Sequence, residues 1–147
     1  MKLHYSIVLG CLLFFIVSST ADARSTFHDL SAKEAAESET GKAKLLDVPF
    51  YMSGQKHAKV ARDFGVFTSN KRTNAFGKSD EQACRIAFLS AIISLQKRAT
   101  QLGGDAVIDI KSTTKHKDLD SPTDYRCAAG GVIANVVLTG KVVKFAK

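Results

Sequence analysis

SDEQACRIAFLSAIISLQKRATQLGGDAVIDIKS, residues 79–112, is the stretch that decides the fold. It predicts one long helix, a glycine stop and a short strand. Ser79 followed three residues later by Gln82 is the capping-box pattern that begins a helix, and the acidic residues between them suit the positive end of the helix dipole. Gly103 and Gly104 supply the left-handed conformation that ends a helix. The segment therefore predicts a helix that turns back into a strand.

The expected helix is apolar over most of its surface. Its polar residues are confined to a narrow stripe around Arg85, Ser90 and Ser94. Such a helix packs against a sheet and contacts other parts of the protein on a second side. We place Ile93 in the middle of its buried apolar face. Residues 106–112 alternate in the way of a half-buried strand. We expect one face to hold Ala106, Ile108 and Ile110, and the other to hold Val107, Asp109 and Lys111.

Other segments also have the composition of strands. Residues 45–52 contain a proline that favours an edge strand, and residues 60–69 contain a glycine that indicates a bulge. Residues 125–145 form the last strand region, whose longest run is interrupted at Gly140. Residues 113–124 before it are expected to be a loop or a frayed hairpin tip. The order β-β-α-β-β predicts an α+β fold, with one long central helix packed on a small, mostly antiparallel sheet.

The N-terminal region, residues 1–23, has the pattern of a secretory signal peptide. It has a basic start, a short apolar run and an A-x-A cleavage signal that ends at Ala23. We expect cleavage before Arg24, which makes the protein periplasmic or secreted and leaves no transmembrane segment. A lipoprotein signal around Cys11 is the alternative, but the apolar run continues past this cysteine instead of preceding it.

The mature chain divides into a leader and one domain. Residues 24–44 are polar and rich in alanine and glutamate, so we expect a flexible leader with at most a short helix over residues 32–37. Residues 45–147 are expected to form a single α+β domain. No internal repeat or linker divides them.

The chain is basic. It has 21 Lys and Arg against 14 Asp and Glu, a formal net charge of +7. Such a balance can indicate anionic partners such as nucleic acid, lipopolysaccharide or a membrane surface. The basic residues are scattered along the sequence and are not interleaved with aromatic residues, so specific nucleic-acid binding is not expected.

Two cysteines, Cys84 and Cys127, remain after the predicted cleavage. In an oxidising compartment two cysteines indicate one disulfide. The expected strand runs back along the helix, so the start of the helix and the start of the last strand region lie at the same end, and the two cysteines can meet. A metal site is not expected, because His28, His57 and His116 are isolated and have no ligand spacing.

No catalytic constellation is visible. Gly77, Lys78 and Ser79 resemble the end of a phosphate-binding loop, but Arg72 stands where that motif requires its first glycine. The carboxylates that follow Ser79 would also repel a phosphate at the helix start. Asp105 and Asp109 are too far apart along a strand to share chemistry. We therefore predict neither an enzyme nor a cofactor.

Three sequence blocks carry a family resemblance: LQKRATQLGGDAVIDI at residues 95–110, DYRC at residues 124–127 and VVLTGKVV at residues 136–143. With residues 68–84, they resemble small exported bacterial proteins that are often labelled excinuclease ATPase subunits. The helix followed by GGDAVI is similar to the YbjQ-like heavy-metal-binding family and to the RcsF-like family of disulfide-bonded outer-membrane stress sensors. The resemblance implies the α+β fold and leaves the activity unspecified.

These observations favour an exported, non-enzymatic protein that acts as a binding or envelope-interaction domain. Its partner would be an envelope protein or ligand that the sequence does not identify. The alternative is an oligomeric metal- or small-ligand-binding protein, because the nearly all-round apolar helix could pack against a second copy in a homo-oligomer.

Overall fold

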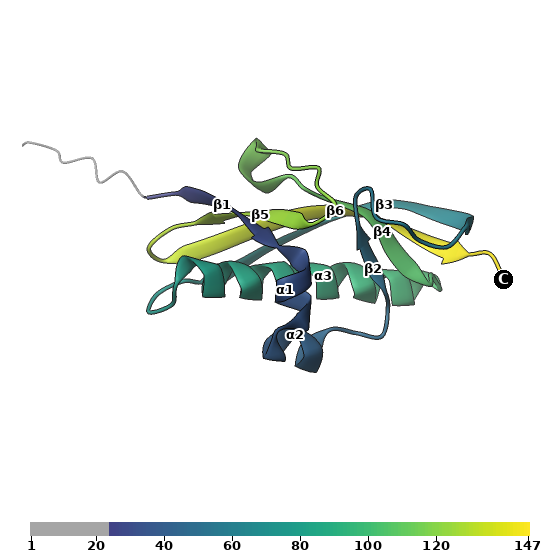
Figure 1. The fold of residues 1–147 in the computed structure, drawn as a ribbon, viewed down its shortest axis with the longest axis horizontal. Coiled ribbons are helices and arrows are strands. Elements are labelled where there is room, and N and C mark those ends of the chain that lie inside the picture. The colour runs from purple at the N-terminus through teal and green to yellow at the C-terminus, as the bar shows by residue number, and fades with distance from the viewer. Residues whose placement is uncertain (1–23) are drawn as a thin grey trace, which may run out of the picture.

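The computed structural model describes residues 24–147, and the predicted signal peptide lies outside them. The fold is α+β: a six-stranded, mostly antiparallel sheet carries one long helix on one face (Figure 1). The elements are β1 Thr26–Ser31, α1 Ala32–Glu37, α2 Glu39–Lys44, β2 Phe50–Met52, β3 Val60–Asn74, α3 Asp80–Leu102, β4 Ala106–Ser112, the 3₁₀ turn η1 Thr114–His116, β5 Asp124–Ala129 and β6 Ile133–Phe145.

The sheet is built around β6. This strand pairs with β3 along one side, and on the other side it pairs first with β5 and then with β4. β1 flanks β5 in antiparallel and β2 flanks β4 in parallel. The predicted interruption at Gly140 is wrong, because β6 runs straight through it. A Cβ at Gly140 would lie 2.7 Å from Val107 Cγ1 and 3.2 Å from Leu95 Cδ1, so the glycine lets helix and sheet approach closely.

Helix α3 begins and ends at the predicted residues. The Ser79 hydroxyl accepts a hydrogen bond from the backbone N–H of Gln82 at 3.1 Å, and Gly103 adopts the left-handed conformation with φ 72°. Its small and apolar face is buried against the sheet, with Ile92 fully buried. Ile93 is only half-buried, so our placement of Ile93 at the middle of the buried apolar face is wrong by one position.

A bulge in β4 changes which residues share a face. Asp109 has a positive φ of 52°, and the register with β6 shifts between Ile108 and Lys111. Ile110 therefore joins the core under α3, whereas Ile108 joins a smaller cluster. The predicted alternation, with Ile108 and Ile110 on one face, is wrong because the bulge inserts an extra residue between them.

Residues 24–44 are not a flexible leader. They contain β1, α1 and α2, and β1 pairs with β5 from Thr26↔Ala129 to Ser31↔Asp124. Figure 1 shows β1 running beside β5 before the chain turns into α1. The segment is polar because it forms a sheet edge and two short surface helices. Its order comes from backbone bonds to β5 and from Ala35, which is buried in the core.

Candidate functional site

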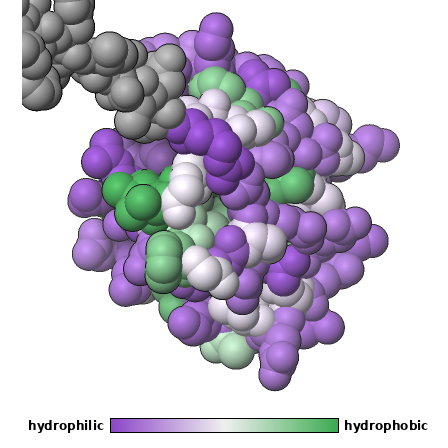
Figure 2. Space-filling model, turned by 90° about the vertical axis from the view of Figure 1, so that its left-hand side faces the viewer, coloured by the Kyte–Doolittle hydropathy of each residue, from purple (hydrophilic) through white to green (hydrophobic). Residues whose placement is uncertain are grey.

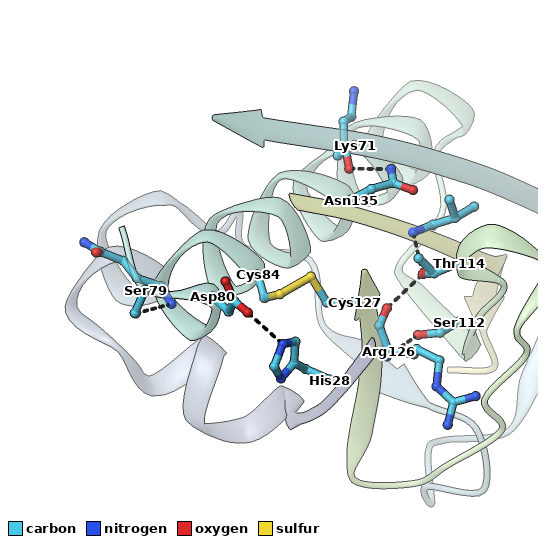
Figure 3. The surroundings of a disulfide bond; sticks show 12 residues. His28, Lys71, Ser79, Asp80, Cys84, Ser112, Thr114, Arg126, Cys127 and Asn135 are labelled. Carbon is cyan, nitrogen blue, oxygen red and sulfur yellow. Dashed lines mark hydrogen bonds and ion pairs between the residues drawn. A yellow bond between two sulfur atoms is a disulfide. The ribbon is translucent and has the colours of Figure 1, made fainter. Parts of the chain in front are cut away.

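The disulfide lies near one end of the molecule. It joins Cys84 in the first turns of α3 to Cys127 in β5, with a Cα–Cα distance of 5.7 Å (Figure 3). Both residues are fully buried. Cys127 lies in the strand before the last one, because the final strand region is divided into β5 and β6 by a turn. The bond fixes the start of the helix to the sheet.

A charged cluster ties β1 to the start of the same helix. Both guanidinium nitrogens of Arg24 donate to the Asp80 carboxylate at 2.9 Å, and His28 Nε2 lies 3.0 Å from the same carboxylate. The hydrogen bonds from Arg24, and secondarily from His28, lower the pKa of Asp80 to about 2. Figure 3 shows His28 and Asp80 facing each other beside the disulfide.

The sheet face opposite α3 carries a hollow of about 400 Å³. Its floor contains Asn135, which lies opposite Ala128 of β5 and Arg72 of β3 in the strand register. Alternate β6 residues such as Ala134 and Val136 belong to the core under the helix, so these three side chains lie on the uncovered face. The lining consists of Arg24, Ser25, Arg72, Lys115, Ala128, Gly130, Gly131, Val132, Ile133 and Asn135.

Arg72 brings an unpaired cation to this hollow. Among residues 24–147 it has no hydrogen bond or ion pair from its guanidinium group, and it is exposed. Arg126 is different, because both Asp29 carboxylate oxygens accept from it at 2.7 Å and the pKa of Asp29 is lowered as a result. The floor of the hollow is polar, and the side-chain amide of Asn135 there already has a hydrogen-bond partner, since it donates to Asn70 Oδ1 at 2.7 Å.

Lys115 reaches the hollow from the connection between β4 and β5. The preceding residue, Thr114, is fully buried; its hydroxyl donates to the Arg126 carbonyl at 2.8 Å and accepts from the Val137 N–H at 3.0 Å. The Ser112 hydroxyl accepts from the Arg126 N–H at 2.9 Å. β4 stops pairing with β6 at this point and β5 pairs with β6 next. The two hydroxyls take the place of backbone partners for the hydrogen-bonding groups of Arg126 and Val137 (Figure 3).

The turn that holds Lys115 is strained. Lys115 and His116 have positive φ values of 48° and 58°, a conformation that costs non-glycine residues of the order of 1–3 kcal/mol each. The anchored Thr114 makes this conformation possible, and the Lys115 ammonium donates to Ser25 Oγ at 2.8 Å. Our expectation of a loop or a frayed hairpin tip over residues 113–124 did not include this turn, because the sequence has no glycine or proline at these two positions.

Exposed apolar side chains lie on the two turns next to the hollow. Phe76 is 77% exposed, Val132 66% and Ile133 48%, and the Ala75 N–H donates to the Val132 carbonyl at 2.7 Å, which holds the two turns together. Figure 2, which views this end of the molecule, shows hydrophobic surface gathered among polar surroundings. The site therefore combines cations with exposed apolar groups.

The other residues considered from the sequence have structural roles. Ser79 caps α3, Lys78 donates to the Asn74 carbonyl, and His57 stacks on Phe145. The residues from Arg24 onward contain no group of three His, Cys, Asp or Glu side chains that could hold a metal ion. The hollow offers a guanidinium group, an ammonium group and alkyl groups, and its two cationic groups can donate hydrogen bonds to an anion.

No family model, curated protein or solved structure matches the chain. In the part of the chain that the structure describes, no helix combines the length and apolar character needed to cross a membrane.

Proposed function

We propose that the protein is an exported, non-enzymatic binding domain of the periplasm or the extracellular side, and that it binds an anionic envelope component in the hollow on the open sheet face. The observation that carries the proposal is the convergence of Arg72 and Lys115 on one cavity. They come from β3 and from the β4–β5 connection, so only the folded sheet brings them together. The buried disulfide supports an oxidising compartment.

The chemistry of the lining defines the ligand class. Arg72 can donate two parallel hydrogen bonds to a phosphate, sulfate or carboxylate, and Lys115 adds a second positive charge. Ile133 and Val132 also line the hollow and offer contact to an alkyl group. An anionic group attached to a hydrocarbon chain satisfies both kinds of surface.

Hexyl phosphate is a suitable probe for this site. Titration into the ¹⁵N-labelled protein, followed by amide chemical shifts, should move resonances around Asn135 and Gly131, and Arg72→Gln and Lys115→Gln should each weaken binding about tenfold. Arg98→Gln is the matched control, because Arg98 lies over the Phe67 ring at a different hollow. An affinity for hexyl phosphate that Arg72→Gln and Lys115→Gln leave unchanged, or that the control variant weakens equally, contradicts the proposal.

The oligomeric alternative also has a structural basis. Within the described chain β3 pairs only with β6, so the outer edge of this 15-residue strand is free. A free edge can pair with the same strand of a second copy. We propose this edge, rather than the helix, as the contact of a homodimer. Size-exclusion chromatography with light scattering tests it, and a monomer at high concentration removes it.

A further inference from the structure

Three large apolar side chains protrude together from one end of the molecule. Phe76 stands on the β3–α3 loop, and Val132 and Ile133 follow the glycines of the β5–β6 turn. The described chain exposes six large hydrophobic side chains, and the other three, Phe27, Leu46 and Val66, lie in other segments of the chain. Half of the exposed large hydrophobic residues therefore lie on, or directly after, two turns that the Ala75–Val132 hydrogen bond joins.

Basic groups lie next to these apolar side chains. Arg72 lines a second hollow together with Phe76, Val132 and Ile133, and it also lines the first hollow with Lys115. Two carboxylates at the nearby start of α3 are already engaged, Asp80 by Arg24 and Glu81 by Arg85. The surface at this end therefore combines exposed apolar side chains with positively charged groups next to them.

We propose that this end docks on the surface of an anionic phospholipid bilayer, with Phe76 and Val132 among the lipids and Arg72 and Lys115 on lipid phosphates. The proposal rests on the proposed function, since it identifies the anionic group of the hollow as a lipid headgroup. Apolar side chains inserted at the headgroup boundary and cations on anionic lipid are the two attractions that hold proteins on membrane surfaces.

The shape of the surface favours a bilayer over a small free ligand. Phe76 does not line the first hollow, so a molecule bound only there leaves the 77% exposed ring in water. A lipid surface covers both turns at once. It also adapts to protruding side chains, whereas a folded protein partner would need a matching cavity for each of them.

Co-sedimentation with vesicles tests the docking. The protein is expressed from its full sequence and isolated after export, with its first residue established by intact mass. We expect binding to vesicles of phosphatidylcholine with phosphatidylglycerol, little binding to phosphatidylcholine alone, and weakening as salt rises. Phe76→Ser should reduce the partition coefficient about tenfold or more, and Arg72→Gln about fivefold.

Val66→Ser and Arg98→Gln are the matched controls. Val66 is 62% exposed but lies eight residues from the end of β3, roughly 26 Å from that end, so vesicle binding should be unchanged. Arg98 lies over the Phe67 ring and not at this end. All four substituted side chains are solvent-accessible, and thermal melting by circular dichroism checks that each variant is folded.

The outcomes separate the two proposals. Hexyl phosphate binding without vesicle binding overturns the docking on a bilayer but agrees with an anionic ligand in the hollow. Vesicle binding that Phe76→Ser leaves intact, or that Val66→Ser weakens equally, overturns docking by this end. Failure of both probes overturns both proposals, and vesicle binding without a response to hexyl phosphate supports the docking while removing the small-ligand site.

Discussion

Removing the disulfide should cost a large part of the stability of this domain. The bond joins Cys84 and Cys127 across a sequence separation of 43 residues, and the chain-entropy model assigns a loop of that size about 4 kcal/mol. Both residues are fully buried, so alanine at both positions also leaves a small cavity, which adds to the loss. We expect the double alanine variant to lose about 4 kcal/mol of unfolding free energy or slightly more.

Urea titration followed by far-ultraviolet circular dichroism measures this loss for three samples: the oxidised protein, the protein treated with a phosphine reductant, and the double variant. The reductant should leave the double variant unchanged, which shows that it acts only through this bond. A loss below about 1 kcal/mol in both altered samples would refute the reasoning. So would alkylation of Cys84 and Cys127 in the freshly isolated protein without reductant, because the start of α3 would then not be joined to β5.

The remaining predictions concern the core, acid stability and processing. Ile92→Asp should unfold the domain or cost about 4 kcal/mol or more, and Ile93→Asp distinctly less, because only Ile92 is fully buried; equal melting temperatures contradict this helix orientation. Gly140→Val should lower the melting temperature through overpacking, with a cost of about 1–3 kcal/mol, and an unchanged melt shows that helix and sheet leave room. The pKa of Asp80 is lowered from 3.8 to about 2, so its ion pairs stabilise the fold above about pH 4, and this stabilisation is lost as the pH falls towards 2. Asp80→Asn should therefore have a lower melting temperature than the unaltered protein at pH 6 and the same melting temperature near pH 2. A difference that persists at pH 2 contradicts this. Intact mass should show a chain beginning at Arg24, and a mass that includes the first residues contradicts export with cleavage.

Local signals predicted the local structure. The Ser79 cap, the left-handed Gly103 and the bounds of β4 all depend on neighbours in sequence, and the structure has them. The strand β1 has no clear pattern of its own, since most of its residues are polar. Its order comes from a partner about 100 positions later, as in Thr26↔Ala129. The bulge at Asp109 was equally invisible, because nothing in residues 106–112 marks the positive φ.

The candidate site could not be predicted for a related reason. A single arginine and a single lysine in separate segments form no motif, and the sequence showed only that basic residues are scattered. Arg72 reaches the hollow because β3 pairs with β6, and Lys115 because the Thr114 hydroxyl bridges β5 and β6. Convergence of this kind is a property of the strand register and not of spacing along the chain.

The position of β6 in the chain has a consequence for synthesis. β6, Ile133–Phe145, follows the other described elements in the chain, yet β3, β4 and β5 all pair with it. A growing chain can form α3 early, but that helix has no completed sheet to cover until residues 133–145 have been made. β1, the first described strand, likewise pairs with β5, which is made about 100 residues later. The sheet can therefore be completed only after β6 has been synthesised.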